Sequence, residues 1–115
     1  MTGLNIPSVT DIGQYAFSEC TTLATADIRN VTNIGNYAFS GCTALTSADI
    51  RNAVNIGNSI FYNCTSLVEV NLPANITTIG TTTFRNCTSL TNVNIDMSNI
   101  ISIGSHAFRG CALLN

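Results

Sequence analysis

Lysine and tryptophan are absent from this 115-residue chain, and charged residues of any kind make up only 9% of it. The net charge is −2 at pH 7, so there is no basic patch for nucleic acid or anionic lipid. No apolar run approaches the roughly 18 residues that span a bilayer, and no signal peptide is visible at the start. We expect no nucleic-acid binding and no membrane insertion. The serine-, threonine- and asparagine-rich composition favours a mature or excised piece of an extracellular or cell-surface protein over a cytoplasmic one.

Residues that could carry catalysis are few and scattered. His106 is the only histidine, and although Cys111 is close in sequence, no orienting group or oxyanion site accompanies the two. We expect His106 at the tip of a surface turn. The six carboxylates form no acid/base pair, and the phosphate-loop, dinucleotide and zinc-protease motifs are missing. The sequence therefore predicts a non-catalytic protein with no cofactor, no metal and only shallow surface grooves.

An internal repeat organises the whole chain. An Ile-Gly pair, a phenylalanine four residues after the glycine, a cysteine three further on and a leucine three beyond that recur five times. The glycines are Gly13, Gly35, Gly57, Gly80 and Gly104; the phenylalanines Phe17, Phe39, Phe61, Phe84 and Phe108; the cysteines Cys20, Cys42, Cys64, Cys87 and Cys111; the leucines Leu23, Leu45, Leu67, Leu90 and Leu114. Strict self-similarity at such a period predicts a solenoid.

All variation in repeat length falls in one segment. Each glycine is ten residues before its leucine, and each leucine is five residues before the next apolar anchor, such as Ile28 or Leu72. Only the step from the anchor to the following Ile-Gly grows, from six to seven before Ile79 and to eight before Ile103. We predict a single solenoid domain over 1–115, with loops at that corner. Its five repeats of 22–24 residues cover about 1–22, 23–44, 45–66, 67–89 and 90–113.

Each repeat has two halves with different periodicity. Ala48 and Ile50 alternate with polar residues, which predicts a short half-buried strand. The apolar residues from Ile34 to Leu45 follow spacings of three and four, which predicts a short helical turn opened by Gly35, where a side chain would crowd the bend. Neither half buries its apolar face alone, but stacked copies do. The expected fold is an α/β solenoid, a right-handed coil with one short parallel strand per repeat and short helical or 3₁₀ turns opposite.

The repeat resembles the BspA-like class of leucine-rich repeats over essentially the whole chain. Leu67-x-x-Val70-x-Leu72 fits the leucine-rich-repeat strand, and Ile-Gly-x-x-Ala-Phe-x-x-Cys-x-x-Leu fits the BspA-like class. The asparagine that commoner classes place three residues after the strand is not kept, so we expect stacked phenylalanines instead of the usual asparagine ladder. These positions are Val31, Ala53, Asn75 and Ser98. The resemblance implies surface adhesion or protein binding.

The five cysteines admit three interpretations. Their spacing of 22 to 24 residues contains no Cys-x-x-Cys pair, and an odd number cannot pair fully. Stacked in register they would lie about 5 Å apart, which allows a disulfide, but their parallel Cβ vectors disfavour one. We favour small buried hydrophobes, with a disulfide or a thiolate metal ladder as alternatives.

The outward side of the strands is the candidate ligand face, suited to another protein or a glycan. Its residues are Thr25, Asp27, Arg29, Ser47, Asp49, Arg51, Glu69, Asn71, Asn92 and Asn94. The alternative is a solvated face in which aspartates and arginines offset each other and asparagines form amide ladders. No aromatic residue anchors this face.

The two ends of the coil have no polar capping repeats. The first strand, which includes Met1, Leu4 and Ile6, falls in the register of Leu23-x-x-Ala26-x-Ile28, and Leu113 and Leu114 begin another copy. Uncapped ends expose apolar residues and strand edges. The chain is then either a segment of a longer array or a subunit that stacks head to tail into a filament.

Overall fold

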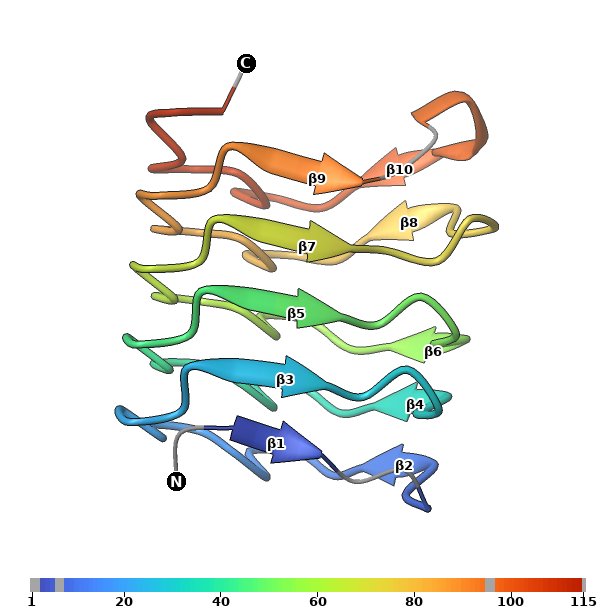
Figure 1. Ribbon diagram of the computed structural model, residues 1–115. Helices are drawn as coiled ribbons and strands as arrows, with labels where there is room; N and C mark the ends of the chain where they lie inside the picture. Colours follow the sequence, from blue (N-terminus) through green and yellow to red (C-terminus); the bar gives the residue numbers. More distant parts are fainter. Residues whose placement is uncertain (1–2, 6–7, 95–96, 115) are drawn as a thin grey trace.

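The structure, a computed structural model, describes residues 3–5, 8–94 and 97–114, which wind into a solenoid (Figure 1). One strand from each turn of the coil joins a five-stranded parallel sheet. These strands, in spatial order, are β1 (Gly3–Asn5), β3 (Thr25–Asp27), β5 (Ser47–Asp49), β7 (Glu69–Asn71) and β9 (Asn92–Asn94). Ala26 pairs with Ala48, and Ala48 with Val70, and all three are buried. The expected parallel-strand solenoid is confirmed.

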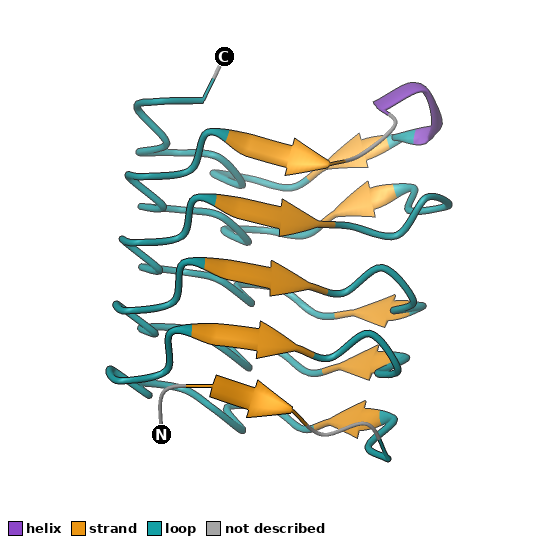
Figure 2. Cartoon of the chain, viewed as in Figure 1, coloured by secondary structure: helices purple, strands orange, loops and turns teal. Residues whose placement is uncertain are grey.

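A second strand in each coil was not predicted from the sequence. These strands are two residues long and end on the isoleucine of the Ile-Gly pair (Figure 2). They are β2 (Asp11–Ile12), β4 (Asn33–Ile34), β6 (Asn55–Ile56), β8 (Thr78–Ile79) and β10 (Ser102–Ile103). Two residues are too few for an alternating pattern to be read.

The helical turns expected opposite the long sheet are absent from the described residues, and this prediction was wrong. Tyr37 and Phe39 donate their amides to the next coil, at the carbonyls of Asn58 and Ile60, both at 3.0 Å. These amides are therefore not available for bonds within a helix. Cys42 donates to the carbonyl three residues back, which makes the segment a run of tight turns (Figure 2).

Positive φ angles make this run of turns possible. Tyr37 has a φ of 60° and Ser59 a φ of 59°, in the left-handed region. The apolar residues keep the spacings of three and four that a helix also has, which is why the sequence suggested one. Among the described residues the only helix is a short 3₁₀ helix, η1 (Met97–Asn99), at the corner between β9 and β10.

The core consists of columns of identical residues stacked along the axis. The phenylalanine rings form one column, with centroids 5.3 to 5.8 Å apart and interplanar angles of 10 to 14°. The expected phenylalanine stack is thus present. Phe39, Phe61 and Phe84 are fully buried, and burial of such large apolar side chains is the dominant stabilising term in folding.

The glycines of the Ile-Gly pairs lie where the backbones of successive coils nearly touch. A Cβ added at Gly35 would lie 2.5 Å from the backbone nitrogen of Gln14, and one at Gly104 would lie 2.4 Å from that of Thr81. A side chain at these positions would therefore push two coils apart, as the sequence analysis expected for the bend.

The second sheet is interrupted between β6 and β8. β2, β4 and β6 form one sheet, and β8 pairs only with β10. No Cα atom of β6 lies within 8 Å of a Cα atom of β8, whereas neighbouring strands of a sheet are about 4.8 Å apart. The wider separation is visible in Figure 1.

The interruption coincides with the first lengthened corner. In the corner before β6, Ala53 donates its amide to the carbonyl of Ile50; in the corner before β8, Ile76 donates to Pro73. The turn therefore begins one residue later in the longer corner. This shift accompanies the displacement of β8 away from β6.

Candidate binding surface

The outward side of the five-stranded sheet carries the polar residues of the candidate ligand face in straight rows. The strand register aligns them, and the alternation with buried residues turns them outward. The first row is Thr25, Ser47, Glu69 and Asn92, and the second is Asp27, Asp49, Asn71 and Asn94. A depression of about 230 Å³ crosses the middle of these rows. The structure thus brings the strand residues of the candidate face together.

Each aspartate of the second row is held by an arginine two residues later. Arg29 donates from Nε and Nη2 to the two carboxylate oxygens of Asp27 at 2.9 and 3.1 Å, and Arg51 holds Asp49 through Nε at 2.9 Å. Asp27 and Asp49 are register partners, so without the arginines their like charges would repel. The paired charges leave the face nearly neutral.

The environment of Asp49 favours its charged form. Its partial burial acts to raise the pKa of the carboxyl group, but hydrogen bonds and charge from Arg51, with a hydrogen bond from Asn71, outweigh that effect and lower the pKa below its ordinary value of 3.8. Asp49 is therefore a fixed negative charge at the centre of the face.

The amide side chains on this face bond partly to one another. Asn94 donates through Nδ2 to Asn71 at 2.5 Å and to Glu69 at 3.0 Å. These bonds and the ion pairs are what the solvated-face alternative expected. Thr25, Ser47 and Asn92 make no side-chain hydrogen bond within the described part of the chain, so their polar groups are available to a ligand.

The middle of the cysteine column is buried: Cys42, Cys64 and Cys87 lie in the core, and Cys20 and Cys111 at its two ends are partly exposed. Burial raises the pKa of Cys42 from 9.0 to about 11 and also raises the pKa of Cys64 and Cys87. All five cysteines are free thiols. The structure therefore has the small buried hydrophobes that we favoured, and not the disulfide alternative. No group of three potential metal ligands occurs among the described residues.

The other candidate residues lie apart from this face. His106 is exposed, with a φ of 58° in a surface turn, as expected. Of the candidate stacking ends, Met1 and Ile6 lie outside the described residues, and the backbone of Leu4 pairs with that of Ala26. Leu113 is 57% exposed, and Leu114 is half-buried against the core.

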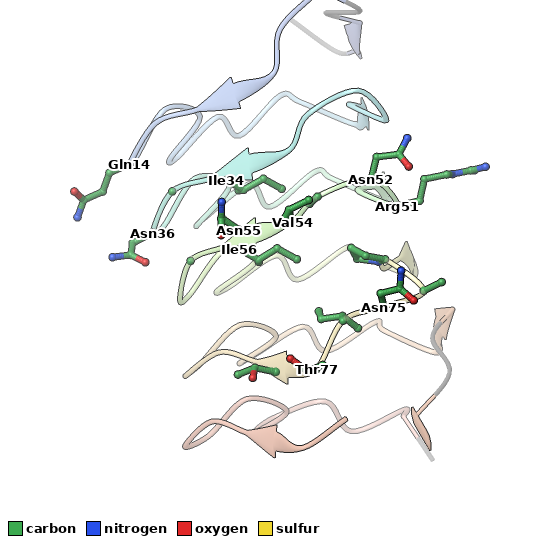
Figure 3. A pocket seen from close by; sticks show the side chains of 17 residues that line it. Gln14, Ile34, Asn36, Arg51, Asn52, Val54, Asn55, Ile56, Asn75 and Thr77 are labelled. Atoms are coloured by element: carbon green, nitrogen blue, oxygen red, sulfur yellow. The ribbon is translucent and has the colours of Figure 1, made fainter. Parts of the chain in front are cut away.

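Sequence reasoning missed a cleft on the second sheet. Its volume is about 1040 Å³, and Figure 3 shows around it side chains from β6, such as Asn55 and Ile56, from the corner before β8, such as Thr77, and from earlier coils, such as Asn36. The cleft is open to solvent, so it agrees with the expected surface grooves, but its place and size were not predicted. The lengthened corner before Ile79 forms one side of this cleft, and in the sequence that extra length indicated only a tolerated insertion.

No helix among the residues that the structure describes has the length and hydropathy needed to cross a membrane.

Comparison with known proteins places the repeat in a family. Residues 1–115 match the family model described as "BspA type Leucine rich repeat region (6 copies)". A search of curated proteins found no match.

Solved structures of bacterial leucine-rich-repeat proteins share the fold. A leucine-rich repeat protein from Bacteroides ovatus ATCC 8483 is 33% identical, with a TM-score of 0.78 over 93% of this chain and 27% of its own. A leucine rich cell surface protein from Faecalibacterium prausnitzii A2-165 is 26% identical, with a TM-score of 0.61 over 84% of this chain and 32% of its own. A leucine-rich repeat protein of T. pallidum, 20% identical, matches with a TM-score of 0.52 over 93% of this chain and 72% of its own.

The chain thus spans about a quarter of the Bacteroides protein and a third of the Faecalibacterium protein. The family match covers all of its residues, and the stacked strands and phenylalanines supply the structural counterpart. The chain belongs to the BspA-type leucine-rich-repeat family.

Proposed function

We propose that this chain is a non-catalytic interaction module of an extracellular or cell-surface protein, which binds another protein or a glycan through the outward face of its five-stranded sheet. The observation that carries the proposal is the in-register alignment of polar side chains in two rows on a rigid sheet. Membership in a repeat family and the cell-surface description of the Faecalibacterium relative support it.

The chemistry of the face favours a polar ligand. Its threonine, serine and asparagine side chains offer both donors and acceptors, and its aspartates are neutralised by arginines. A face without an aromatic anchor favours many modest hydrogen bonds over one buried hot spot. We therefore expect weak, multivalent adhesion, in which repeated copies increase the avidity.

The test is binding to a panel of purified extracellular-matrix proteins and to a glycan array. The double variant Ser47→Arg/Asn92→Arg places long side chains on the first row without touching the core, and we expect it to reduce binding by at least about tenfold. The control variant Thr43→Ala/Ser105→Ala changes exposed residues outside the sheet and should bind like the unaltered chain. No binding to any member of the panel, or equal loss in both variants, would contradict the proposal.

A second candidate is the structural subunit of a filament. In the described part of the chain, the outer coil that contains Gln14 and Ala16 has carbonyls without a protein partner, and the outer coil that contains His106 and Phe108 has amides without one. Donors at one end and acceptors at the other are complementary, and Leu113 adds an exposed apolar side chain.

Light scattering across a concentration series separates this candidate from the first. Head-to-tail stacking predicts a mass that grows with concentration and fibres in negative-stain microscopy. A monomer at all concentrations argues against the filament and leaves the interaction module.

A further inference from the structure

The interruption of the second sheet leaves a gap between β6 and β8, which closes one residue further on, where a Cβ added at Gly80 would lie 3.2 Å from the carbonyl oxygen of Gly57. The Cα atoms of β6 and β8 are more than 8 Å apart, and two regular strand spacings amount to about 9.6 Å. The cleft of about 1040 Å³ extends along the second sheet into this gap, where Val54 and Ile56 (Figure 3) line one side and Thr78 the other.

The two walls of the cleft present complementary backbone groups. Between paired coils, Gly57 donates its amide to the carbonyl of Ile34 at 2.8 Å, and Gly104 donates to Ile79 at 2.7 Å. The equivalent bond from Gly80 to Ile56 is missing within the described residues. One wall therefore offers the carbonyl of Ile56, and the other the amide of Gly80, each without a partner in the chain.

The same break occurs two residues earlier in each strand. Val54 and Asn55 donate their amides to the carbonyl of Thr32, at 2.7 and 3.0 Å. The carbonyl of Val54 receives no such bond from Thr78 in the described part of the chain. The unpaired groups thus recur with the two-residue spacing of a parallel strand.

A ladder of side-chain amides also stops at the cleft. Asn33 donates through Nδ2 to the carboxylate of Asp11, and Asn55 donates through Nδ2 to Oδ1 of Asn33 at 2.6 Å. Oδ1 of Asn55 is the next acceptor in this ladder. The residue at the equivalent position of the following coil is Thr78, on the other side of the gap. An added strand would place a donor side chain beside Asn55.

The floor of the cleft is apolar. Ile56 is partly exposed, although the equivalent Ile34 and Ile79 are buried to 3% and 2% exposure. An inward apolar side chain on an added strand would cover Ile56, which contributes favourably through the hydrophobic effect.

We propose that this cleft binds an extended peptide segment, which joins β6 to β8 as an added parallel strand. The segment carries an asparagine or another side-chain donor beside Asn55, followed by an apolar residue over Ile56. A glycine then lets the segment turn out of the gap, because the two coils meet again at Gly57 and Gly80. Backbone donors on one wall and acceptors on the other favour a polypeptide over a glycan, because such walls recognise a strand by main-chain hydrogen bonds. This site lies on the second sheet and is separate from the face in the proposed function.

The probe is a blocked synthetic peptide with the sequence of residues 31–36, Val-Thr-Asn-Ile-Gly-Asn, which forms the strand adjacent to β6 in the chain itself. We expect it to shift the amide NMR signals of residues 54–57 and 77–80 and to slow hydrogen exchange at Thr78 and Gly80. No shifts at millimolar peptide, or shifts confined to the five-stranded sheet, would overturn the proposal.

Two controls test the hydrogen-bond pairing. The same peptide N-methylated at its first asparagine and its glycine lacks the amides that would reach the carbonyls of Val54 and Ile56, and should bind at least about tenfold more weakly. Thr78→Pro removes an amide from the opposite wall at the first position of a strand, where proline is tolerated, and should weaken binding similarly.

Further measurements separate this site from other ligands and surfaces. The face variant Ser47→Arg/Asn92→Arg should bind the peptide unchanged. Equal binding of the methylated and unmethylated peptides would overturn the proposal without needing any protein variant. The proposal would also be overturned if a neutral oligosaccharide shifted the same amide signals and the peptide did not.

Discussion

At the scale of single residues, the solenoid depends on glycines, which have no side chain at the places where two coils meet. Gly35 is packed against the backbone of Gln14 in the preceding coil, whereas a Cβ at Gly13 would meet nothing within 4 Å. Neither glycine has a positive φ. The two glycines therefore occupy the same place in the repeat. They differ only in that a described coil precedes Gly35 and none precedes Gly13.

This difference gives a matched pair of substitutions. Gly35→Ala forces a methyl group against main-chain atoms that cannot move without separating two coils, so we expect it to lower the free energy of unfolding by about 1–3 kcal/mol. Gly13→Ala should be neutral or slightly stabilising. Urea denaturation of both variants checks this, and equal midpoints would show that the close approach does not matter.

The residue scale also shows what the sequence could predict. The burial of Phe61, Cys64 and Leu67 follows directly from their strict phase in the repeat. The left-handed φ of Tyr37 and Ser59 does not, because neither residue type favours that region. Only hydrogen bonds to the next coil reveal why these residues adopt it.

At the scale of elements, the cysteines form a ladder with the backbone. Cys42 donates through Sγ to the carbonyl of Phe17 at 3.1 Å, and Cys64 donates to that of Phe39 at 3.2 Å. Four of the five thiols, from Cys42 to Cys111, thus bond to a carbonyl of the preceding coil, where serine in place of cysteine would bring a more strongly hydrated hydroxyl. Sequence reasoning placed these cysteines in the core but did not find this role.

The ladder predicts sensitivity to alkali. Burial raises the pKa of Cys42 from 9.0 to about 11 in the folded chain, so between these values the unfolded chain loses a proton that the folded chain keeps. Stability is then complete below about pH 9 and falls as the pH rises toward 11. Denaturant titrations from pH 8 to 11 measure this.

Cys42→Ala provides the control for the alkaline effect. The variant should be less stable at pH 8, because it loses a packed sulfur and its hydrogen bond. Its stability should nevertheless fall less steeply with pH than that of the unaltered chain. Parallel curves for the two proteins would mean that Cys42 does not ionise on unfolding in this range.

At the scale of the whole molecule, one change in corner length coincides with the loss of pairing between two coils. Corners of the short length place β4 against β2 and β6 against β4, and the next corner, one residue longer, leaves β8 unpaired with β6. The repeat lengths were evident in the sequence. The gap was not, because it is a relation between two coils and no single repeat contains it.

Deleting Asn75 restores the short corner and should close the gap. Ile76 would then occupy the place of the buried Ala53, and Thr78 and Gly80 would donate to Val54 and Ile56. We expect hydrogen exchange at these two amides to slow by about tenfold or more and binding of the 31–36 peptide to be lost. Unchanged exchange at Thr78 would show that corner length is not the cause.

The tight turns opposite the long sheet also give that side of the coil a uniform electrical polarity. On that side, amides such as those of Tyr37 and Phe39 all point toward the following coil, and each peptide unit carries a dipole of about 3.5 D. On this side, carbonyl oxygens therefore point toward β2 and amide hydrogens toward β10. On the second sheet the amides of Gly35 and Gly57 point the other way, toward the preceding coil. The coil therefore has two sides of opposite polarity, whereas all the peptide dipoles of an α-helix point the same way.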